Sequence, residues 1–269
     1  MALIELEGVS KAFFTDKHKT EAKIALSGLD LAIEEGEFVS LLGPSGCGKT
    51  VTLSLIAGFM TPTLGEVRFK GEPVCAPGPD RGVVFQEYSL FPWQSVKRNV
   101  VFAARNAARA RGQRLSRDEL DRRAMAALST VGLADVAEAR PNTLSGGMKQ
   151  RVAIARLLAM DSEVFLMDEP FSALDEQTRH ALDRNIYDLW RHEGKTVVFV
   201  THSISEAVLV SSRIVLFSRS PGKVVGQWHL HDDESRDPAS PAYQALCDEI
   251  RTRMPSSPCS FAFERGLQD

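Results

Sequence analysis

Short apolar runs separated by turns dominate the first third of the chain. Runs that alternate or are continuously apolar are typical of strands, and they occur at residues 3–6, 29–33, 37–42, 66–70 and 82–85. After the third run, a glycine-rich turn leads into a helical pattern that begins at Lys49 and ends before Gly58. This region therefore predicts strands joined by turns, with one early helix.

The pattern changes near Val96. From there to about Val131, alanine and arginine dominate and β-branched residues become rare, which favours helices. Alternation of helices and strands resumes at Ser145 with a predicted helix. Strands are predicted after it at residues 164–167, 196–200 and 213–217. Between the first two of these strands, a helix is predicted whose apolar face holds Leu182, Ile186, Leu189 and Trp190.

Strands that alternate with helices indicate an α/β chain with a mostly parallel sheet covered by helices. The chain then divides into four parts. We expect residues 1–95 to form an N-terminal β part and the first half of the core. We expect residues 96–145 to form an inserted helical subdomain, and residues 146–228 to complete the core. Residues 229–269 are a polar C-terminal tail for which we predict no regular structure.

Composition narrows the class of protein. The chain has 269 residues, is 43% hydrophobic and 25% charged, and carries a net charge of −3, so a broadly basic nucleic-acid-binding surface is not expected. Its four cysteines show no metal-ligand spacing. No apolar run is long enough to span a membrane, and the N-terminus lacks the basic region of a signal peptide. These features predict a cytosolic protein.

Residues 43–50, GPSGCGKT, fit the pattern G-x-x-x-x-G-K-[ST] and lie between a predicted buried strand and a predicted helix. Glycines allow backbone N–H groups to turn toward phosphate oxygens, and the helix N-terminus adds the positive end of its dipole. Lys49 would then reach the β- and γ-phosphates, and the Thr50 hydroxyl would bind Mg²⁺. A chance glycine-rich turn is the alternative, and the strand and helix on either side argue against it.

A second apolar strand ends in two carboxylates, Asp168 and Glu169. Such a strand end can simply be solvated. Beside a phosphate loop, however, Asp168 can hold Mg²⁺ through water, and Glu169 can orient and polarise an attacking water. Shortly before this strand, LSGGMKQ (residues 144–150) opens a helix, where Ser and Gly make either a flexible N-cap or a second anion-binding terminus.

These three motifs together, GPSGCGKT, LSGGMKQ and VFLMDEP, resemble the ATP-binding subunit of an ABC transporter over about residues 3–226. The resemblance implies an α/β fold with a P-loop NTPase core of the RecA type, an inserted helical subdomain and a small N-terminal antiparallel β part. It also implies ATP and Mg²⁺ as cofactors, and ATP hydrolysis coupled to transport. The stretch from Pro77 to Gln86, followed by Leu90 to Trp93, is similar to importers of the nitrate, sulfonate and taurine type.

The resemblance assigns roles residue by residue. Glu169, His202 and Gln86 would be catalytic, and Thr50, Gln86 and Asp168 would hold the metal. The nucleotide would contact Phe13, the loop residues Gly43, Pro44, Ser45, Gly46, Cys47, Gly48, Lys49 and Thr50, the signature residues Ser145, Gly146, Gly147 and Gln150, and Asp175 of the D-loop. Taken singly, Gln86 and His202 are also compatible with ordinary polar strand ends, and Phe13 or Phe14 with the core. Ser203 stands where the family usually has Asp.

In the family, the signature of one subunit closes on the ATP of another. The resemblance therefore implies a second copy of the chain as partner, with transmembrane permease subunits and, indirectly, a solute-binding protein. It implies no nucleic acid, and a peripheral location on the cytoplasmic face of the inner membrane. The alternatives are an ATPase of another transporter class, a non-transport ABC ATPase, a small-molecule kinase with the same loop, or a regulatory module that does not hydrolyse ATP.

Two further patterns carry less information. Residues 97–123 hold nine Lys or Arg and three acids, a net charge of +6. Such a run can meet lipid headgroups or a partner, and a solvated helical face is the more ordinary interpretation. His229, His231, Asp232 and Asp233 fit no ligand spacing, so we interpret them as part of a polar tail.

Overall fold

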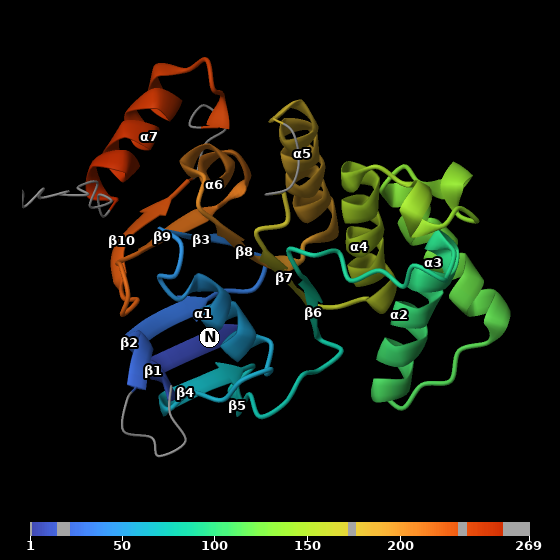
Figure 1. The fold of residues 1–269 in the computed structure, drawn as a ribbon, viewed down its shortest axis with the longest axis horizontal. Helices are drawn as coiled ribbons and strands as arrows, with labels where there is room; N and C mark the ends of the chain where they lie inside the picture. The colour runs from blue at the N-terminus through green and yellow to red at the C-terminus, as the bar shows by residue number, and fades with distance from the viewer. Residues whose placement is uncertain (1, 15–21, 172–175, 231–235, 255–269) are drawn as a thin grey trace, which may run out of the picture.

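The computed structural model describes residues 2–14, 22–171, 176–230 and 236–254. Two sheets organise the left half of Figure 1, and helices make up the right half. The smaller, antiparallel sheet has the order β2-β1-β4-β5, with β1 at Ile4–Phe14, β2 at Ala22–Ile33, β4 at Leu64–Phe69 and β5 at Glu72–Pro73. It realises the predicted N-terminal β part. Both β1 and β2 extend beyond the predicted apolar runs, because each pairs with the other along most of its length.

The larger sheet forms the core and has six strands in the order β10-β9-β3-β8-β7-β6. All of its pairs are parallel except β10 with β9. The strands are β3 at Phe38–Leu42, β6 at Arg81–Val84, β7 at Val164–Asp168, β8 at Thr196–Thr201, β9 at Arg213–Phe217 and β10 at Val224–His229. This is the mostly parallel α/β sheet that the sequence predicts, with β10 as an addition.

Helices cover both faces of this sheet. Helix α1 (Lys49–Ile56) packs between the two sheets, in one apolar cluster with residues of both. On the opposite face lie α5 (Glu176–Glu193), α6 (Ile204–Val210) and one side of α4 (Gly146–Met160). Alternate side chains of β7 serve the two faces: Val164 and Leu166 join the cluster around α1, while Phe165 and Met167 join the other.

The helical region contains α2 (Val96–Ala110), α3 (Arg117–Thr130) and two short 3₁₀ turns at Ala134–Val136 and Pro141–Thr143. A third apolar cluster joins α2 and α3 to α4. Helix α4 therefore has two apolar sides: Val152 and Ala155 face α2 and α3, while Ile154 and Leu157 face the core. Residues 146–160, which we expected in the second half of the core, therefore pack on both regions.

The C-terminal part differs from the sequence expectation. Residues 229–269 are predicted to lack regular structure, yet Pro241–Arg253 form helix α7, capped by the Ser240 side chain. Cys247 and Ile250 of α7 are buried against α6 and β9 in a fourth apolar cluster. Figure 1 shows α7 beside α6 at the end of the molecule remote from α2 and α3. The signal was present in the sequence, because Ser240 and Pro241 mark a helix start and Tyr243, Leu246, Cys247, Ile250 and Met254 follow at helical spacing.

Candidate active site

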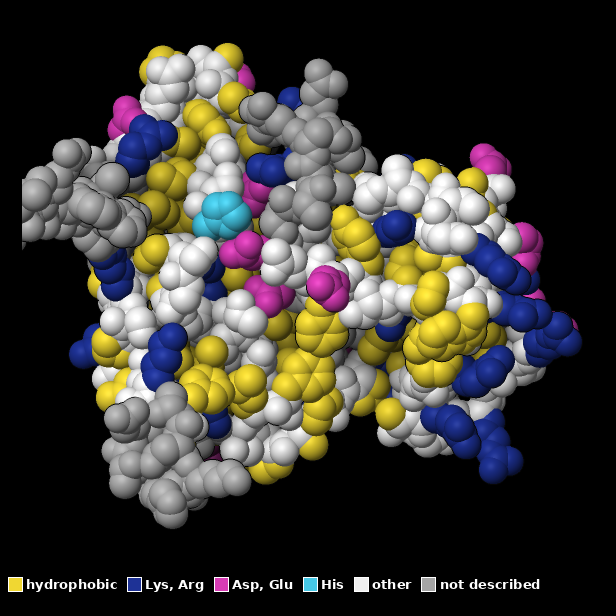
Figure 2. Space-filling view, in the orientation of Figure 1, with side chains coloured by type: hydrophobic (Ala, Val, Ile, Leu, Met, Phe, Trp, Pro, Cys, Tyr) yellow, Lys and Arg dark blue, Asp and Glu magenta, His cyan; other side chains and the backbone are white. Residues whose placement is uncertain are grey.

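Four neighbouring parallel strands end at one edge of the large sheet, and chemistry-bearing residues follow each of them. The register aligns Leu42 with Thr201, Asp168 with Val200, and Val84 with Met167. The phosphate loop therefore follows β3, His202 follows β8, Asp168 and Glu169 end β7, and Gln86 follows β6. Open parallel sheets bind ligands at this carboxyl edge. Histidine and carboxylate side chains gather at the centre of the face in Figure 2.

The loop between β3 and α1 depends on a glycine next to its lysine. Gly48 is the N-cap of α1 and has φ 101°, a conformation that favours glycine. A Cβ at Gly48 would lie 2.5 Å from the Leu26 side chain and 3.0 Å from the Ala25 carbonyl oxygen. The loop thus packs directly on β2, and a larger residue at Gly48 would displace it. Cys47 is buried beside it, and burial raises the pKa of its thiol.

Lys49 is a buried cation. Its side chain is enclosed, with the residue only 4% exposed, and its Nζ donates to the carbonyl oxygens of Gly43 at 2.7 Å and Pro44 at 3.1 Å. Among the described residues, no carboxylate forms an ion pair with it. Burying a charge is costly unless an opposite charge compensates it. The loop is therefore suited to an anionic ligand such as a phosphate group.

Thr50 and Asp168 are brought together across the sheet edge. The Thr50 hydroxyl donates to Oδ1 of Asp168 at 3.0 Å. Burial raises the pKa of the Asp168 carboxyl above its usual value, and the neighbouring Glu169 adds to this effect. The hydrogen bond from Thr50 and the charge of Lys49 oppose it. A hydroxyl and a carboxylate at this separation are hard oxygen donors of the kind that Mg²⁺ prefers.

Glu169 and His202 form a second pair at the same edge. Nδ1 of His202 lies 3.3 Å from Oε2 of Glu169, and the Glu169 side chain is 21% exposed against 56% for His202. The Glu169 backbone has φ 43°, an uncommon conformation for a residue other than glycine, and its N–H donates to the Val200 carbonyl. Strained backbone of this kind clusters at functional sites. With this conformation, the backbone changes direction at Glu169, immediately after Asp168.

The segment behind His202 is held by residues that the sequence analysis missed. Ser203 caps α6 by accepting from the backbone N–H of Glu206 at 3.3 Å. The Glu206 carboxylate is buried, accepts a hydrogen bond from the Thr201 hydroxyl, and lies 3.4 Å from Arg179 of α5. Ser203 therefore acts as a helix cap at the position where the family usually has Asp. The S-x-x-E pattern of a capping box was the available signal.

Gln86 lies exposed just after β6, at the same sheet edge as Asp168. The segment that follows it is tied to α4, because the Arg156 guanidinium donates to the Ser89 carbonyl oxygen at 2.8 Å. Burial lowers the pKa of Arg156. A shift of this segment would therefore be transmitted to α4 and to the helical region.

The signature residues lie elsewhere. Ser145 caps α4 by accepting from the Met148 N–H, and Gly146 and Gly147 begin the helix. In Figure 1, α4 and α1 lie in opposite halves of the molecule, so one chain does not bring the signature to its own phosphate loop. Gln150 has no exposed surface, and both its amide atoms lack a hydrogen-bond partner. That placement is at odds with the predicted direct contact between Gln150 and the nucleotide.

Phe13 lies near the end of β1, where its ring is 37% exposed and 5.5 Å from Nζ of Lys11. An exposed ring can stack on a base, so its position is compatible with the predicted role. Asp175 lies outside the described residues, as do the three residues before it.

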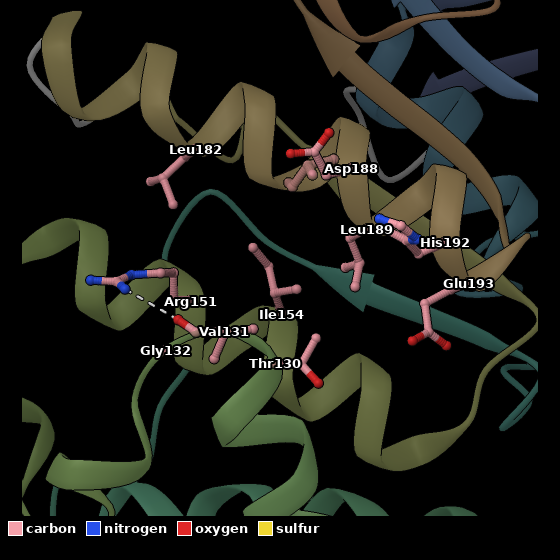
Figure 3. A pocket seen from close by; sticks show the side chains of 11 residues that line it. Thr130, Val131, Gly132, Arg151, Ile154, Leu182, Asp188, Leu189, His192 and Glu193 are labelled. Atoms are coloured by element: carbon pink, nitrogen blue, oxygen red, sulfur yellow. Dashed lines mark hydrogen bonds between the residues drawn. The ribbon is translucent and has the colours of Figure 1, made fainter.

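A cavity of about 500 Å³ lies away from this edge, between α4, α5 and the end of α3. Figure 3 shows Ile154, Leu182 and Leu189 pointing toward one another across it, with Arg151 bonded to the Val131 carbonyl at its rim. None of the predicted nucleotide residues lines it. The cavity marks the junction between the helical region and the core.

Comparison with known proteins agrees with this geometry. The family model described as ABC transporter matches residues 26–172. The nitrate import ATP-binding protein of Synechococcus elongatus is 41% identical over 204 residues, 76% of this chain and 73% of the relative. The taurine import ATP-binding protein of Jannaschia sp. is 44% identical over 207 residues, 77% of this chain and 75% of the relative.

The fold comparison gives the same result. A dimeric ATP-binding cassette, solved in a post-hydrolysis state with ADP and phosphate, matches with a TM-score of 0.73 and 34% identity. The match covers 85% of this chain and 99% of that one. A match over more than half of the chain, relatives above 40% identity, and a phosphate loop facing an Asp-Glu strand end lead to one conclusion. The chain belongs to the family of ABC transporter ATP-binding proteins.

Proposed function

We propose that this chain binds Mg-ATP and hydrolyses it as the ATPase subunit of an ABC importer. The observation that carries the proposal is the convergence of three features at one sheet edge. They are the buried cation Lys49, which no carboxylate of the described ranges pairs with, the Thr50–Asp168 pair and the Glu169–His202 pair. Each group has a separate task in phosphoryl transfer, where catalysis consists mainly of positioning and charge neutralisation.

Phosphate binding falls to the loop. The backbone N–H groups at the start of α1 and the ammonium of Lys49 would hold the β- and γ-phosphate oxygens. In the structure, this ammonium donates to two carbonyl groups of its own loop. Phosphate oxygens would replace these neutral acceptors with charged ones, and charge-assisted hydrogen bonds are about twice as strong as neutral ones.

Thr50 and Asp168 are the residues that would hold Mg²⁺, with Gln86 approaching from the neighbouring strand. When bound, the ion neutralises charge on the β- and γ-phosphates. Glu169 would accept the proton of the attacking water, and His202 would contact the γ-phosphate. The 3.3 Å separation between Nδ1 of His202 and Oε2 of Glu169 supports a joint action of these two side chains.

A second copy of the chain would complete the site. The Ser145–Gly147 start of α4 has the backbone N–H groups of an anion-binding helix terminus, and it lies in the opposite half of the molecule from the phosphate loop of its own chain. In a two-fold dimer, it would close on the nucleotide bound to the other phosphate loop. The dimeric cassette that matches this fold supports such an assembly.

The permease contact would be made by the segment after Gln86. Trp93 is 69% exposed, and its ring contacts Phe91, which in turn contacts Phe102 of α2. The buried Asn99 side chain fixes this turn, because its amide accepts from the Phe91 N–H and donates to the Phe91 carbonyl. Exposed aromatic side chains on a fixed turn are suited to anchor a partner. The alternative, an internal apolar contact, does not account for the exposure of Trp93.

The solute would be a small anion, since the relatives named above are nitrate and taurine import proteins. Within the described residues, no helix combines the length and apolar character needed to cross a membrane. We propose that the subunit lies at the cytoplasmic face of the inner membrane, attached to permease subunits that receive solute from a solute-binding protein.

Glu169→Gln tests the catalytic assignment. The substitution keeps the shape and removes the basicity, so hydrolysis should slow by roughly 10²- to 10⁴-fold while ATP binding survives. Because bound ATP would then persist, the variant should dimerise on addition of Mg-ATP, as measured by light scattering. Glu138→Gln, an exposed carboxylate of the helical region, is the matched control. A near-normal rate in Glu169→Gln would assign the base to another residue, and a monomer at saturating ATP would refute the shared site.

A further inference from the structure

The outer face of α2 carries an unbalanced positive stripe. Arg98, Phe102, Arg105 and Arg109 follow one another at intervals of four, three and four residues, which places them on one side of the helix. All four are exposed, and the opposite side of α2 is buried against α3 and α4. The α2 sequence contains no acidic residue. We call Arg98, Phe102, Arg105 and Arg109 the α2 stripe.

In the neighbouring helix, α3, charged side chains form ion pairs. In α3, Arg122 and Arg123 both pair with Glu119, and Asp121 pairs with Lys97 at 2.9 Å. Among the described residues, Arg98, Arg105 and Arg109 form no ion pair. Arg105 and Arg109 are also four residues apart, where like charges destabilise a helix. A solvated face alone would gain from acidic residues between them, and α2 has none.

Aromatic side chains accompany this charge. Phe102 belongs to the stripe, and its ring packs edge-on against Phe91, which contacts the exposed Trp93. Figure 2 shows a hydrophobic group over α2 bordered by Lys and Arg side chains. An exposed Phe among basic residues is typical of surfaces that lie against membrane headgroups.

We propose that the α2 stripe binds the anionic lipid headgroups of the membrane on which this subunit acts. Charge complementarity favours this occupant. The whole chain has net charge −3 while residues 97–123 carry +6, so this stretch is opposite in sign to the chain as a whole and is suited to an anionic leaflet. The orientation toward the membrane rests on the proposed permease contact of Trp93. The lipid contact itself requires no permease.

Flotation of the full-length subunit with lipid vesicles tests the proposal. Vesicles of phosphatidylcholine with phosphatidylglycerol should bind the protein, and vesicles of phosphatidylcholine alone should not. Near an anionic surface, each basic residue contributes about fivefold in binding. The triple variant Arg98→Gln, Arg105→Gln, Arg109→Gln should therefore bind roughly 100-fold more weakly. Binding by the unaltered protein should also fall at high salt.

The matched control removes the same charge elsewhere. The control replaces three exposed residues outside the helical region, Lys23, Arg184 and Lys223, by Gln. This variant has the same net charge as the stripe variant, yet it should bind vesicles as the unaltered protein does. Equal loss in both triple variants, or equal binding to both vesicle types, would overturn the proposal. The proposal would also be overturned if the protein did not bind vesicles and the stripe variant lost its binding to the permease. That result would assign the stripe to a protein partner.

One further readout completes the test. ATP hydrolysis by the stripe variant in solution should equal that of the unaltered subunit, since α2 holds none of the nucleotide residues. Failure of lipid binding is thereby distinguished from failure of the proposed ATPase function.

Discussion

The sheet edge that carries the phosphate loop and the helical region of α2–α4 handle charge in opposite ways. At the sheet edge, Lys49 is almost fully buried and Asp168 and Glu169 are largely enclosed. In the helical region, Val, Leu and Ala side chains make up most of the packing between α2, α3 and α4, and the arginines of the α2 stripe lie outside. The first arrangement costs folding free energy that a charged ligand can recover, whereas the second is stable without a ligand.

This difference predicts which substitutions should affect nucleotide binding and which should affect partner binding. Residues of the sheet edge should change nucleotide affinity and rate with little effect on the packing of α2–α4. Residues of the helical region should change partner contacts and local stability while ATP binding persists. The two regions are nevertheless in direct contact, because Arg156 of α4 binds the Ser89 carbonyl and α4 packs on both of them.

Lys49→Ala should have the largest effect of the substitutions in these two regions, a loss of ATP affinity. It removes the single side-chain cation of the loop and with it charge-assisted hydrogen bonds worth about 1.5–3 kcal/mol each. ATP affinity should fall by roughly 100-fold or more, as measured with a fluorescent ATP analogue. Folding stability should not fall, because the substitution also removes a buried charge.

Lys195→Ala is the control for this change. Lys195 pairs with Asp161 at 3.0 Å on the surface, and such pairs contribute about 0–1 kcal/mol. ATP affinity should remain unchanged. If Lys49→Ala bound the analogue as tightly as this control, the nucleotide would bind somewhere other than the loop.

Asn99→Leu should affect the helical region alone. It leaves the Phe91 N–H without its acceptor, at a cost of about 1–3 kcal/mol, while the Phe91 carbonyl keeps the hydrogen bond from the Gln94 N–H. Amide hydrogen exchange should become faster around Phe91 and Trp93, while ATP affinity stays the same. Asn106→Leu, at an exposed position of the same helix, should leave exchange in this turn unchanged. A loss of ATP affinity comparable to that of Lys49→Ala would show that the two regions do not act separately.

A buried acid in α5 provides the pH-dependent prediction. Burial, with a contribution from the Glu206 charge, raises the pKa of Asp183 to about 8, and Arg179 opposes the shift. Below about pH 4, the carboxyl is protonated in the folded and unfolded states. Between about 4 and about 8, the unfolded chain has released this proton and the folded protein retains it. The free energy of unfolding therefore falls by about 1.4 kcal/mol for each pH unit as the pH rises from about 4 to about 8.

Asp183→Asn should remove this dependence, so its melting temperature should exceed that of the unaltered protein at pH 8 by more than at pH 5. Differential scanning calorimetry at the two pH values measures the effect. Asp188→Asn changes an exposed carboxylate on the same helix and should alter neither value. An Asp183→Asn variant whose stability falls equally at both values would show that the native Asp183 is ionised.

Local sequence signals were sufficient for the elements around the phosphate loop. The apolar strands, the glycine-rich turn and the start of α1 depend on neighbours along the chain, and the structure has them where the patterns predict. The meeting of Thr50 with Asp168 also follows from sequence, because parallel strands place their carboxyl ends at one edge. The roles assigned to these residues remain predictions.

Elements that depend on distant contacts were harder to predict. Strand β10 alternates between half-buried and exposed residues on a single neighbour. The burial of Gln150 and Glu206 depends on helices far away in sequence, and no pattern within a short window reports such contacts. Helix α7 is different, because its Ser-Pro start and its apolar residues at helical spacing are a local signal that our prediction of a polar tail overlooked.

The strand order also has a consequence for biosynthesis. Strand β3, which leads into the phosphate loop, ends at residue 42, yet its two neighbours β8 and β9 begin only at residues 196 and 213. On the ribosome, this fully buried strand therefore waits for about 150 further residues before either edge is paired. Such long-range pairing slows folding and leaves apolar strands open to aggregation. A nascent chain that has not yet reached β8 holds the whole phosphate-loop sequence and lacks both strands that flank β3 in the sheet.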